Sequence, residues 1–207
     1  MSGLIVALVV IAIVVVLVLV FVGLYNGLIK LRNVVQESWR QIDVELNRRH
    51  DLIPNLVETV KGYAAHERGT LDEVTAARAA AAAPGASPAQ QAQQENVLTQ
   101  ALGRLFAVAE AYPDLKANQN FLQLQRDLSD TEDRVAASRR FYNANVRALN
   151  TKVETVPSNI VAGMFGIKTA EYFEVEDGQV RQAPQVSFGT TTTTTPPAAP
   201  QQTPPTA

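Results

Sequence analysis

The first 29 residues carry no charged side chain, and this run constrains the fold more than any other part of the chain. Between Leu4 and Leu24 every residue is Leu, Ile, Val, Ala, Phe or Gly. As a helix rising ~1.5 Å per residue, this stretch is about 30 Å long, which matches the hydrocarbon thickness of a bilayer. In lipid only a helix satisfies its own backbone hydrogen bonds, so residues 1–27 are predicted to form a transmembrane anchor.

A cleavable signal peptide is the alternative interpretation of this run. Such a peptide has a basic start, an apolar stretch of roughly 7–15 residues and a small-residue cleavage site. Residues 1–3 contain no Lys or Arg, the apolar stretch is longer, and residues 24–27 make a poor cleavage site. We therefore expect a retained single-pass anchor whose partner is the lipid bilayer.

The charges that follow the anchor predict its orientation. No basic residue precedes the apolar run, and the first five that follow it are Lys30, Arg32, Arg40, Arg48 and Arg49. The positive-inside rule then places the C-terminal domain in the cytoplasm and a short N-terminus outside the cell membrane. The absence of cysteine fits a cytoplasmic domain and equally a secreted domain without disulfides, so it decides nothing.

Apolar residues spaced three and four apart predict an all-α fold, an elongated antiparallel bundle of long helices over residues 28–167. The first helix is expected to continue out of the membrane. The segment Asp51–Pro54 predicts a kink or a restart, because proline disrupts a helix interior and Asp51 is a good N-cap. The next helix would then run from Leu52 to about Ala83.

Further start and stop signals delimit the remaining helices. Ser87 and Gln90 make a capping box for a third helix ending near Ala111, in which Val97 is among the residues expected to be buried. A last long helix with a near-heptad, coiled-coil-like stripe is predicted from about Leu115 to Val156. Residues 168–188 are expected to form an extended strap with a turn at Asp177-Gly178. Residues 189–207, rich in Thr and Pro, should be disordered.

The chemistry-bearing residues favour no reaction. The net charge is −2, with 18 basic and 20 acidic residues mixed along the chain, so nucleic acid is not an expected partner. The two histidines, His50 and His66, lack both the H-E-x-x-H and the Glu-x-x-His spacing, and we interpret them as ordinary polar positions. No P-loop, G-x-G-x-x-G or G-x-S-x-G motif occurs. We therefore expect no catalytic residues, no bound metal and no cofactor.

One dense polar cluster is a candidate interaction site. It comprises Asp43, Arg48, Arg49, Asp51, Pro54, Asn55 and Glu58. Its residues could cap and ion-pair the helices around the proline junction. Alternatively, they could form a docking surface for a partner.

The block from Arg48 to Tyr63, R-R-H-D-L-I-P-N-L-V-E-T-V-K-G-Y, resembles the signature of the LemA family. Shorter segments agree in the right order over roughly residues 25–188, namely Leu31-Arg32-Asn33, Ile42-Asp43-Val44, Tyr112–Asn118, Thr131-Glu132, Tyr142-Asn143, Pro157-Ser158-Asn159 and Tyr172-Phe173. The chain departs from the pattern at His50, where an aromatic residue such as Tyr is more usual.

The resemblance implies a bacterial membrane protein with an external N-terminus and a cytoplasmic helical domain. It supplies no catalytic residues, because the family has no established activity, and a relative associated with magnetosome membranes indicates a role in membrane organisation.

Two hypotheses for function follow. The first is a membrane-anchored scaffold that recruits protein partners or further copies of itself. The second is a sensor or small-ligand or lipid-binding module, with Asn118, Thr131 and Asn145 lining a polar cavity.

Overall fold

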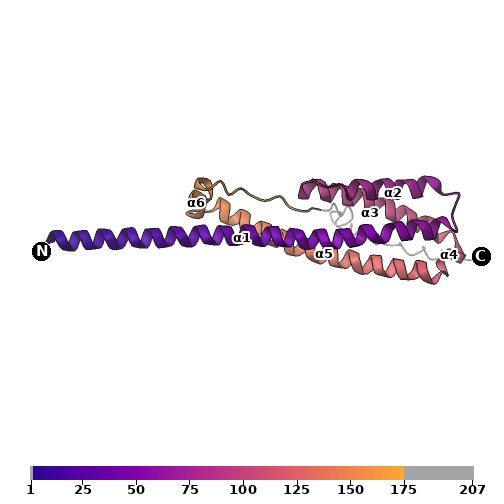
Figure 1. Cartoon of the computed structure of the whole chain (residues 1–207), viewed down its shortest axis with the longest axis horizontal. Coiled ribbons are helices and arrows are strands. Elements are labelled where there is room, and N and C mark those ends of the chain that lie inside the picture. The colour runs from indigo at the N-terminus through magenta and orange to yellow at the C-terminus, as the bar shows by residue number, and fades with distance from the viewer. Residues whose placement is uncertain (1, 175–207) are drawn as a thin grey trace, which may run out of the picture. The chain divides into compact units, whose positions relative to one another are not determined.

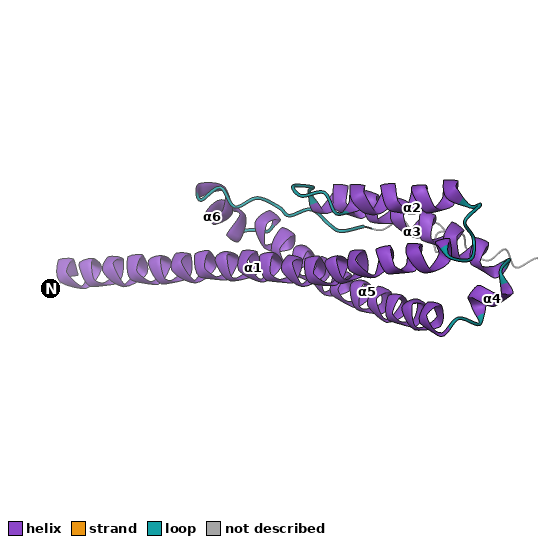
Figure 2. Ribbon diagram, turned by 45° about the vertical axis from the view of Figure 1, so that its right-hand side comes forward, coloured by secondary structure: helices purple, strands orange, loops and turns teal. Residues whose placement is uncertain are grey.

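The computed structural model describes residues 2–174, and every regular element within them is a helix. The helices are α1 (Ser2–Lys61), α2 (Arg68–Ala81), α3 (Pro88–Glu110), α4 (Pro113–Lys116), α5 (Gln119–Glu154) and α6 (Ser158–Met164) (Figure 1). α5 runs antiparallel along α1, and α2 and α3 form a hairpin beside them (Figures 1 and 2). The predicted all-α class and antiparallel packing are therefore confirmed. The turn at Asp177-Gly178, the rest of the strap beyond residue 174 and the tail lie outside the described residues.

The N-terminal part of α1 is apolar and uncovered. Residues 2–20 are all exposed, whereas from Leu28 onward one stripe of α1 is buried in the bundle. Within the described part of the chain, α1 is the one helix long and apolar enough to cross a bilayer, and none of its apolar window is buried. Apolar surface of this extent is unfavourable in water, so this end of α1 is a candidate membrane span.

The restart expected at Asp51–Pro54 is wrong. α1 passes through Pro54 without interruption, and Asp51 is an exposed residue inside the helix rather than an N-cap. The chain leaves the helix only after Lys61, and α2 begins at Arg68. The single helix predicted from Leu52 to Ala83 is thus the end of α1 and the whole of α2, separated by a turn.

An external donor explains why α1 tolerates Pro54. Proline has no N–H, so the carbonyl of the residue four positions earlier, His50, loses its helical hydrogen bond. Arg78 of α2 supplies the missing donor, because its Nε lies 2.8 Å from the His50 carbonyl oxygen. The orphaned carbonyl thereby joins α2 to the C-terminal part of α1.

Other predicted helix ends agree with the structure in part. The capping box of Ser87 and Gln90 is present at the start of α3, as predicted. α5 begins at Gln119 rather than near Leu115, because the Asn118 side chain accepts a hydrogen bond from the Phe121 N–H and caps it. Val97, expected in the buried stripe of α3, is 53% exposed, so that assignment is wrong.

The buried apolar residues fall into two cores along the bundle. The distal core is Ile53, Leu56, Val60, Ala64, Leu71, Val74, Ala77, Ala81, Leu98, Ala101, Leu102, Leu105, Ala109, Leu115, Phe121 and Leu128. The proximal core, nearer the apolar end of α1, is Leu28, Val35, Ile42, Leu46, Ala92, Val135, Tyr142, Val146, Leu149, Val161, Ala162, Ile167 and Phe173. α1, α3 and α5 contribute to both, so these helices pass from one core to the other.

The chain after α6 is fastened to α5 by side-chain amides. Asn143 accepts from the Phe173 N–H and donates to the Phe173 carbonyl, both at 3.0 Å, and Asn150 makes the same pair of bonds with Ala170. Tyr142 donates to the Glu171 carbonyl at 2.8 Å, and burial raises the pKa of Tyr142 to about 12. Its hydroxyl therefore keeps the donated proton at any physiological pH. This segment, the first part of the predicted strap, lies on α5 without forming a strand.

The bond between Arg78 and His50 can be tested with a double-mutant cycle. Arg78→Met keeps the aliphatic stem but removes the donor, and we expect it to lower the free energy of unfolding by about 1–3 kcal/mol, the usual cost of an unsatisfied buried acceptor. In a Pro54→Ala background the alanine introduced there has an N–H that can bond the His50 carbonyl, so the same substitution should cost clearly less. Denaturant unfolding of the full chain in detergent measures both values. An equal cost in the two backgrounds would contradict this account of Pro54.

Candidate functional site

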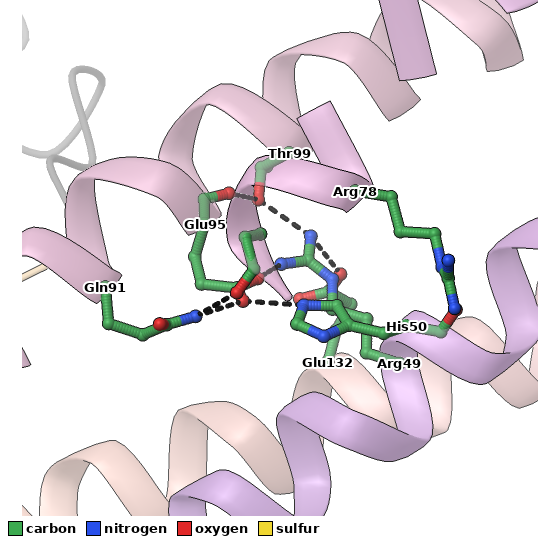
Figure 3. Close-up of polar contacts among 8 residues, drawn as sticks. Arg49, His50, Arg78, Gln91, Glu95, Thr99 and Glu132 are labelled. Carbon is green, nitrogen blue, oxygen red and sulfur yellow. Dashed lines mark hydrogen bonds and ion pairs between the residues drawn. The ribbon is translucent and has the colours of Figure 1, made fainter. Parts of the chain in front are cut away.

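A polar layer separates the two cores and joins the long helices. We define it as Arg49 and His50 of α1, Gln91, Glu95 and Thr99 of α3, and Glu132 of α5. Figure 3 shows these side chains converging from three helices, with Arg78 of α2 beside them. In each helix the layer lies at the step from proximal to distal core residues, for example between Leu46 and Ile53 in α1.

Arg49 is the centre of the layer. Its side chain is only 2% exposed, yet both terminal nitrogens of the guanidinium have oxygen partners on neighbouring helices. Nη1 lies 2.6 Å from Glu95 Oε2, whereas Nη2 lies 2.8 Å from Thr99 Oγ1 and 2.7 Å from Glu132 Oε1. The planar fork of the guanidinium thus joins α1 to both α3 and α5.

Glu95 receives hydrogen bonds on both carboxylate oxygens. Oε2 is bonded by Arg49, and Oε1 is bonded by His50 Nε2 at 2.8 Å and by Gln91 Nε2 at 3.0 Å. A carboxylate only accepts, so the His50 proton must be on Nε2. Gln91 also donates to the Ala81 carbonyl at 2.8 Å, which fastens the end of α2 to the layer. The Glu95 side chain, 3% exposed, is therefore buried with hydrogen-bond partners on both carboxylate oxygens.

The sequence does contain a signal for this layer, which our sequence analysis missed. Arg49 occupies the four-three spacing of the buried stripe of α1, between Leu46 and Ile53. Glu95 occupies the same spacing in α3, between Gln91 and Leu98. A cation in one apolar stripe and an anion in another predict a buried pair, because neither charge could be buried alone.

The predicted docking cluster is divided by the structure. Arg49 turns inward to the polar layer. The other six, Asp43, Arg48, Asp51, Pro54, Asn55 and Glu58, are exposed. At about 100° per residue these six fall within an arc of about 140° on α1, so they share one face of the helix. A docking surface at this cluster therefore cannot include Arg49, which instead makes ion pairs inside the bundle.

The two histidines differ from each other. His66 is exposed, in line with an ordinary polar position, but His50 is buried in the polar layer, so that interpretation of His50 is wrong. Its ring nitrogen Nδ1 has no hydrogen-bond partner among residues 2–174. Within the same residues no three His, Cys, Asp or Glu side chains lie close enough together to hold a metal ion.

The residues proposed to line a polar cavity do not come together as one. Asn118 caps α5 and donates to the Tyr63 hydroxyl, and Thr131 bonds the Asp127 carbonyl of its own helix. A groove of about 460 Å³ lies elsewhere, between α3 and α5 and over the polar layer. It is lined by Arg49, Thr99, Leu102, Gly103, Phe106, Gln125, Leu128, Ser129 and Glu132. None of the three predicted residues lines it.

Glu132 is only partly buried in the layer. Its side chain is 42% exposed, compared with 3% for Glu95. Burial raises the pKa of Glu132 above its usual 4.5, and the negative charges of Glu95 and Asp133 add to this effect, so the attraction of Arg49 is outweighed. The charged form of Glu132 is thus disfavoured by folding, even though it pairs with Arg49. The layer joins α1, α3 and α5 at one level of the bundle.

The two carboxylates should respond oppositely to neutralisation. Glu95→Gln leaves Arg49 buried without its main counter-charge, and we expect a loss of roughly 3–5 kcal/mol in the free energy of unfolding. Glu132→Gln should cause no loss at pH 7, because a carboxyl group whose pKa is raised in the folded state binds protons more tightly there than in the unfolded chain.

The raised pKa of Glu132 also determines how the stability difference between wild type and Glu132→Gln depends on pH. The contribution of Glu132 is fully present below its unfolded pKa, near 4.5, and is lost as pH rises through the raised folded value. Wild type and Glu132→Gln should therefore be about equally stable below pH 4.5, and the variant should become the more stable one above it. Unfolding curves across this range provide the measurement. A larger loss from Glu132→Gln than from Glu95→Gln would overturn the assignment of roles.

The fold and the polar layer define a class: a helical bundle with one candidate membrane-spanning helix that continues into its core. The chain belongs to the LemA family, whose model matches residues 38–188. It is 26% identical over 156 residues to Protein LemA of Metamycoplasma hominis, a match that covers 75% of this chain and 71% of that protein. It is 27% identical over 175 residues to Magnetosome protein MamQ 2 of Paramagnetospirillum magneticum, covering 72% of this chain and 64% of the relative. Magnetosome protein MamQ of Magnetospirillum gryphiswaldense is 25% identical over 174 residues, with the same coverage.

Proposed function

We propose that this protein is a membrane-anchored scaffold. α1 spans the cell membrane and carries the bundle on the cytoplasmic side, where its surface recruits protein partners or further copies of the chain, without catalysis. One observation carries the proposal: α1 is unbroken from its exposed apolar residues to Lys61, so the anchor and the longest helix of the bundle are the same element. A rigid connection of this kind suits a protein that positions others at a membrane.

The charges and the relatives support the same role. The basic residues that follow the apolar run favour a cytoplasmic bundle. Two of the relatives are named as magnetosome proteins, and by analogy we infer a part in organising membrane-associated complexes. The polar layer would keep the bundle in one arrangement while partners bind its outer faces.

The exposed face of α1 is the docking surface in this proposal. We call the residues Asp43, Arg48, Asp51, Pro54, Asn55 and Glu58 the α1 face. Arg48 pairs with Glu45 at 3.4 Å, and Glu58 pairs with Lys61 at 3.4 Å, both along the helix and both exposed to solvent. Asp43 and Asp51 add two further carboxylates, so the expected partner presents a basic surface.

Site-specific photo-cross-linking tests the docking surface in native membranes. A photoreactive residue at Asn55 should form cross-links to a small, reproducible set of proteins or to a second copy of the chain. Asn55 is exposed, so the replacement should leave the bundle intact. A photoreactive residue at Ala76, exposed on α2, is the matched control.

Charge reversal makes this experiment specific. The double variant Asp51→Lys and Glu58→Lys should abolish the Asn55 cross-links if carboxylates recognise a basic partner, whereas the far-UV circular dichroism should be unchanged because both residues are exposed. If Asn55 and Ala76 give the same cross-links, or if charge reversal has no effect, the α1 face is not the docking surface.

A further inference from the structure

A second uncharged apolar surface lies next to the candidate membrane span. Residues 155–167 contain no charged side chain. On α6, Ser158, Val161 and Ala162 are buried against the bundle, yet the opposite side is also apolar and faces outward. Val156 is 76% exposed, Ile160 61%, Met164 67% and Phe165 50%. A helix that is apolar on both sides still exposes apolar area after it packs against the bundle, and such area favours a further contact.

This surface is continuous with the apolar part of α1. The Phe165 ring lies 4.5 Å from that of Tyr25 and 6.0 Å from that of Phe21, centroid to centroid. Phe21 and Tyr25 lie in the last turns of the uncharged run, which ends before Lys30. Figure 2 shows α6 beside α1 at the end of α5 that is farthest from α4. The exposed side chains of α6 therefore stand at the level where α1 would leave the bilayer.

We propose that α6 is a second membrane contact, and that its outward face lies in the boundary between headgroups and acyl chains of the leaflet from which α1 emerges. Short apolar surfaces at this level insert about 5–10 Å into a bilayer. The occupant is lipid rather than protein because the surface continues directly into that of the span. This inference rests on the proposed anchoring by α1.

The charges around α6 agree with that depth. Lys152 reaches to about 4.0 Å from the position that a β-carbon on Gly27 would occupy, which places its amine close to the end of the span. Lys30 follows on α1, and the uncharged stretch that contains α6 lies between Glu154 and Lys168. Lysines at this level attract anionic headgroups while the side chains between them remain in apolar surroundings.

A second contact would fix the orientation of the bundle. A single helix leaves the attached bundle free to tilt and to turn different sides toward the membrane surface. α6 is attached to α1 on one side, so its insertion would hold that side against the lipid. The partners recruited by a scaffold would then meet a bundle of defined orientation.

Depth-dependent fluorescence quenching of the full chain tests the inference. The chain has no cysteine, so single cysteines at Ile160, Val14 and Val97 accept one environment-sensitive fluorophore each. The variants are reconstituted in vesicles of phosphatidylcholine and phosphatidylglycerol that carry a nitroxide either near the headgroups or near the ends of the acyl chains. Val14 reports the span, and Val97, 53% exposed on α3, is the matched apolar control away from it.

We expect the emission maximum of the label at Ile160 to shift to shorter wavelength. The nitroxide near the headgroups, the shallow quencher, should quench most of its emission. The label at Val14 should lose more emission to the deep quencher, and the label at Val97 should lose none to either. Quenching at Val14 without quenching at Ile160 would overturn the inference and leave the anchor intact. If Val14 itself is not quenched, the proposed anchoring fails.

A triple variant gives an independent readout. Val156→Ser, Ile160→Ser and Met164→Ser remove the three most exposed apolar side chains but keep the ring contacts of Phe165 with α1, so helix content should be unchanged. In this variant the label at Asn159, next to the removed surface, should no longer be quenched by the shallow nitroxide. Persistent quenching would show that α6 is held near the lipid by α1 alone, which would also overturn the inference.

Discussion

The buried pair of Arg49 and Glu95 is the interaction on which the arrangement of the helices depends. Both side chains are almost completely removed from water, and such burial is tolerated only when each charge is paired and hydrogen-bonded. A shift of α3 along α1 by one turn, about 5.4 Å, would leave both charges unpaired in apolar surroundings. The apolar residues of the two cores could pack in several registers, whereas the pair accepts one. The layer therefore sets the level at which α1, α3 and α5 meet.

A hydrogen bond at the same level explains why α1 is continuous. Pro54 deprives the His50 carbonyl of its helical partner, and Arg78 supplies a donor from α2. The hydrogen bond that α1 lacks at Pro54 is thus replaced by one to α2, next to the residues that join α1 to α3 and α5. Because α1 is not interrupted there, the candidate membrane span and both cores share one helix. Motion of the anchor would then be transmitted to the distal core rather than absorbed at a hinge.

Features encoded by neighbouring residues could be predicted from the sequence. The apolar run of α1 and the Ser87 capping box require only local hydropathy and hydrogen bonding. The continuity of α1 through Pro54 could not be predicted, because the donor that satisfies the His50 carbonyl belongs to a different helix. Arg49 can be recognised as part of a polar cluster, and its position in the buried stripe of α1 indicates that its side chain points inward. To predict that Arg49 pairs with Glu95, one must know how far α3 is shifted along α1, and helical periodicity alone does not give this shift. His50 was misjudged for the same reason.

The central claim is that one continuous helix connects the membrane to the bundle, and a distance measurement along α1 tests it most directly. Spin labels at the exposed residues Asn33 and Glu58, on either side of the polar layer and of Pro54, can be placed on the cysteine-free chain in lipid nanodiscs. A straight helix rising ~1.5 Å per residue separates these positions by about 38 Å. Pulsed electron paramagnetic resonance should therefore give one narrow distribution near that distance. A broad distribution, or a distance shorter by several ångströms, would show a bend or break at Pro54 and would contradict the account.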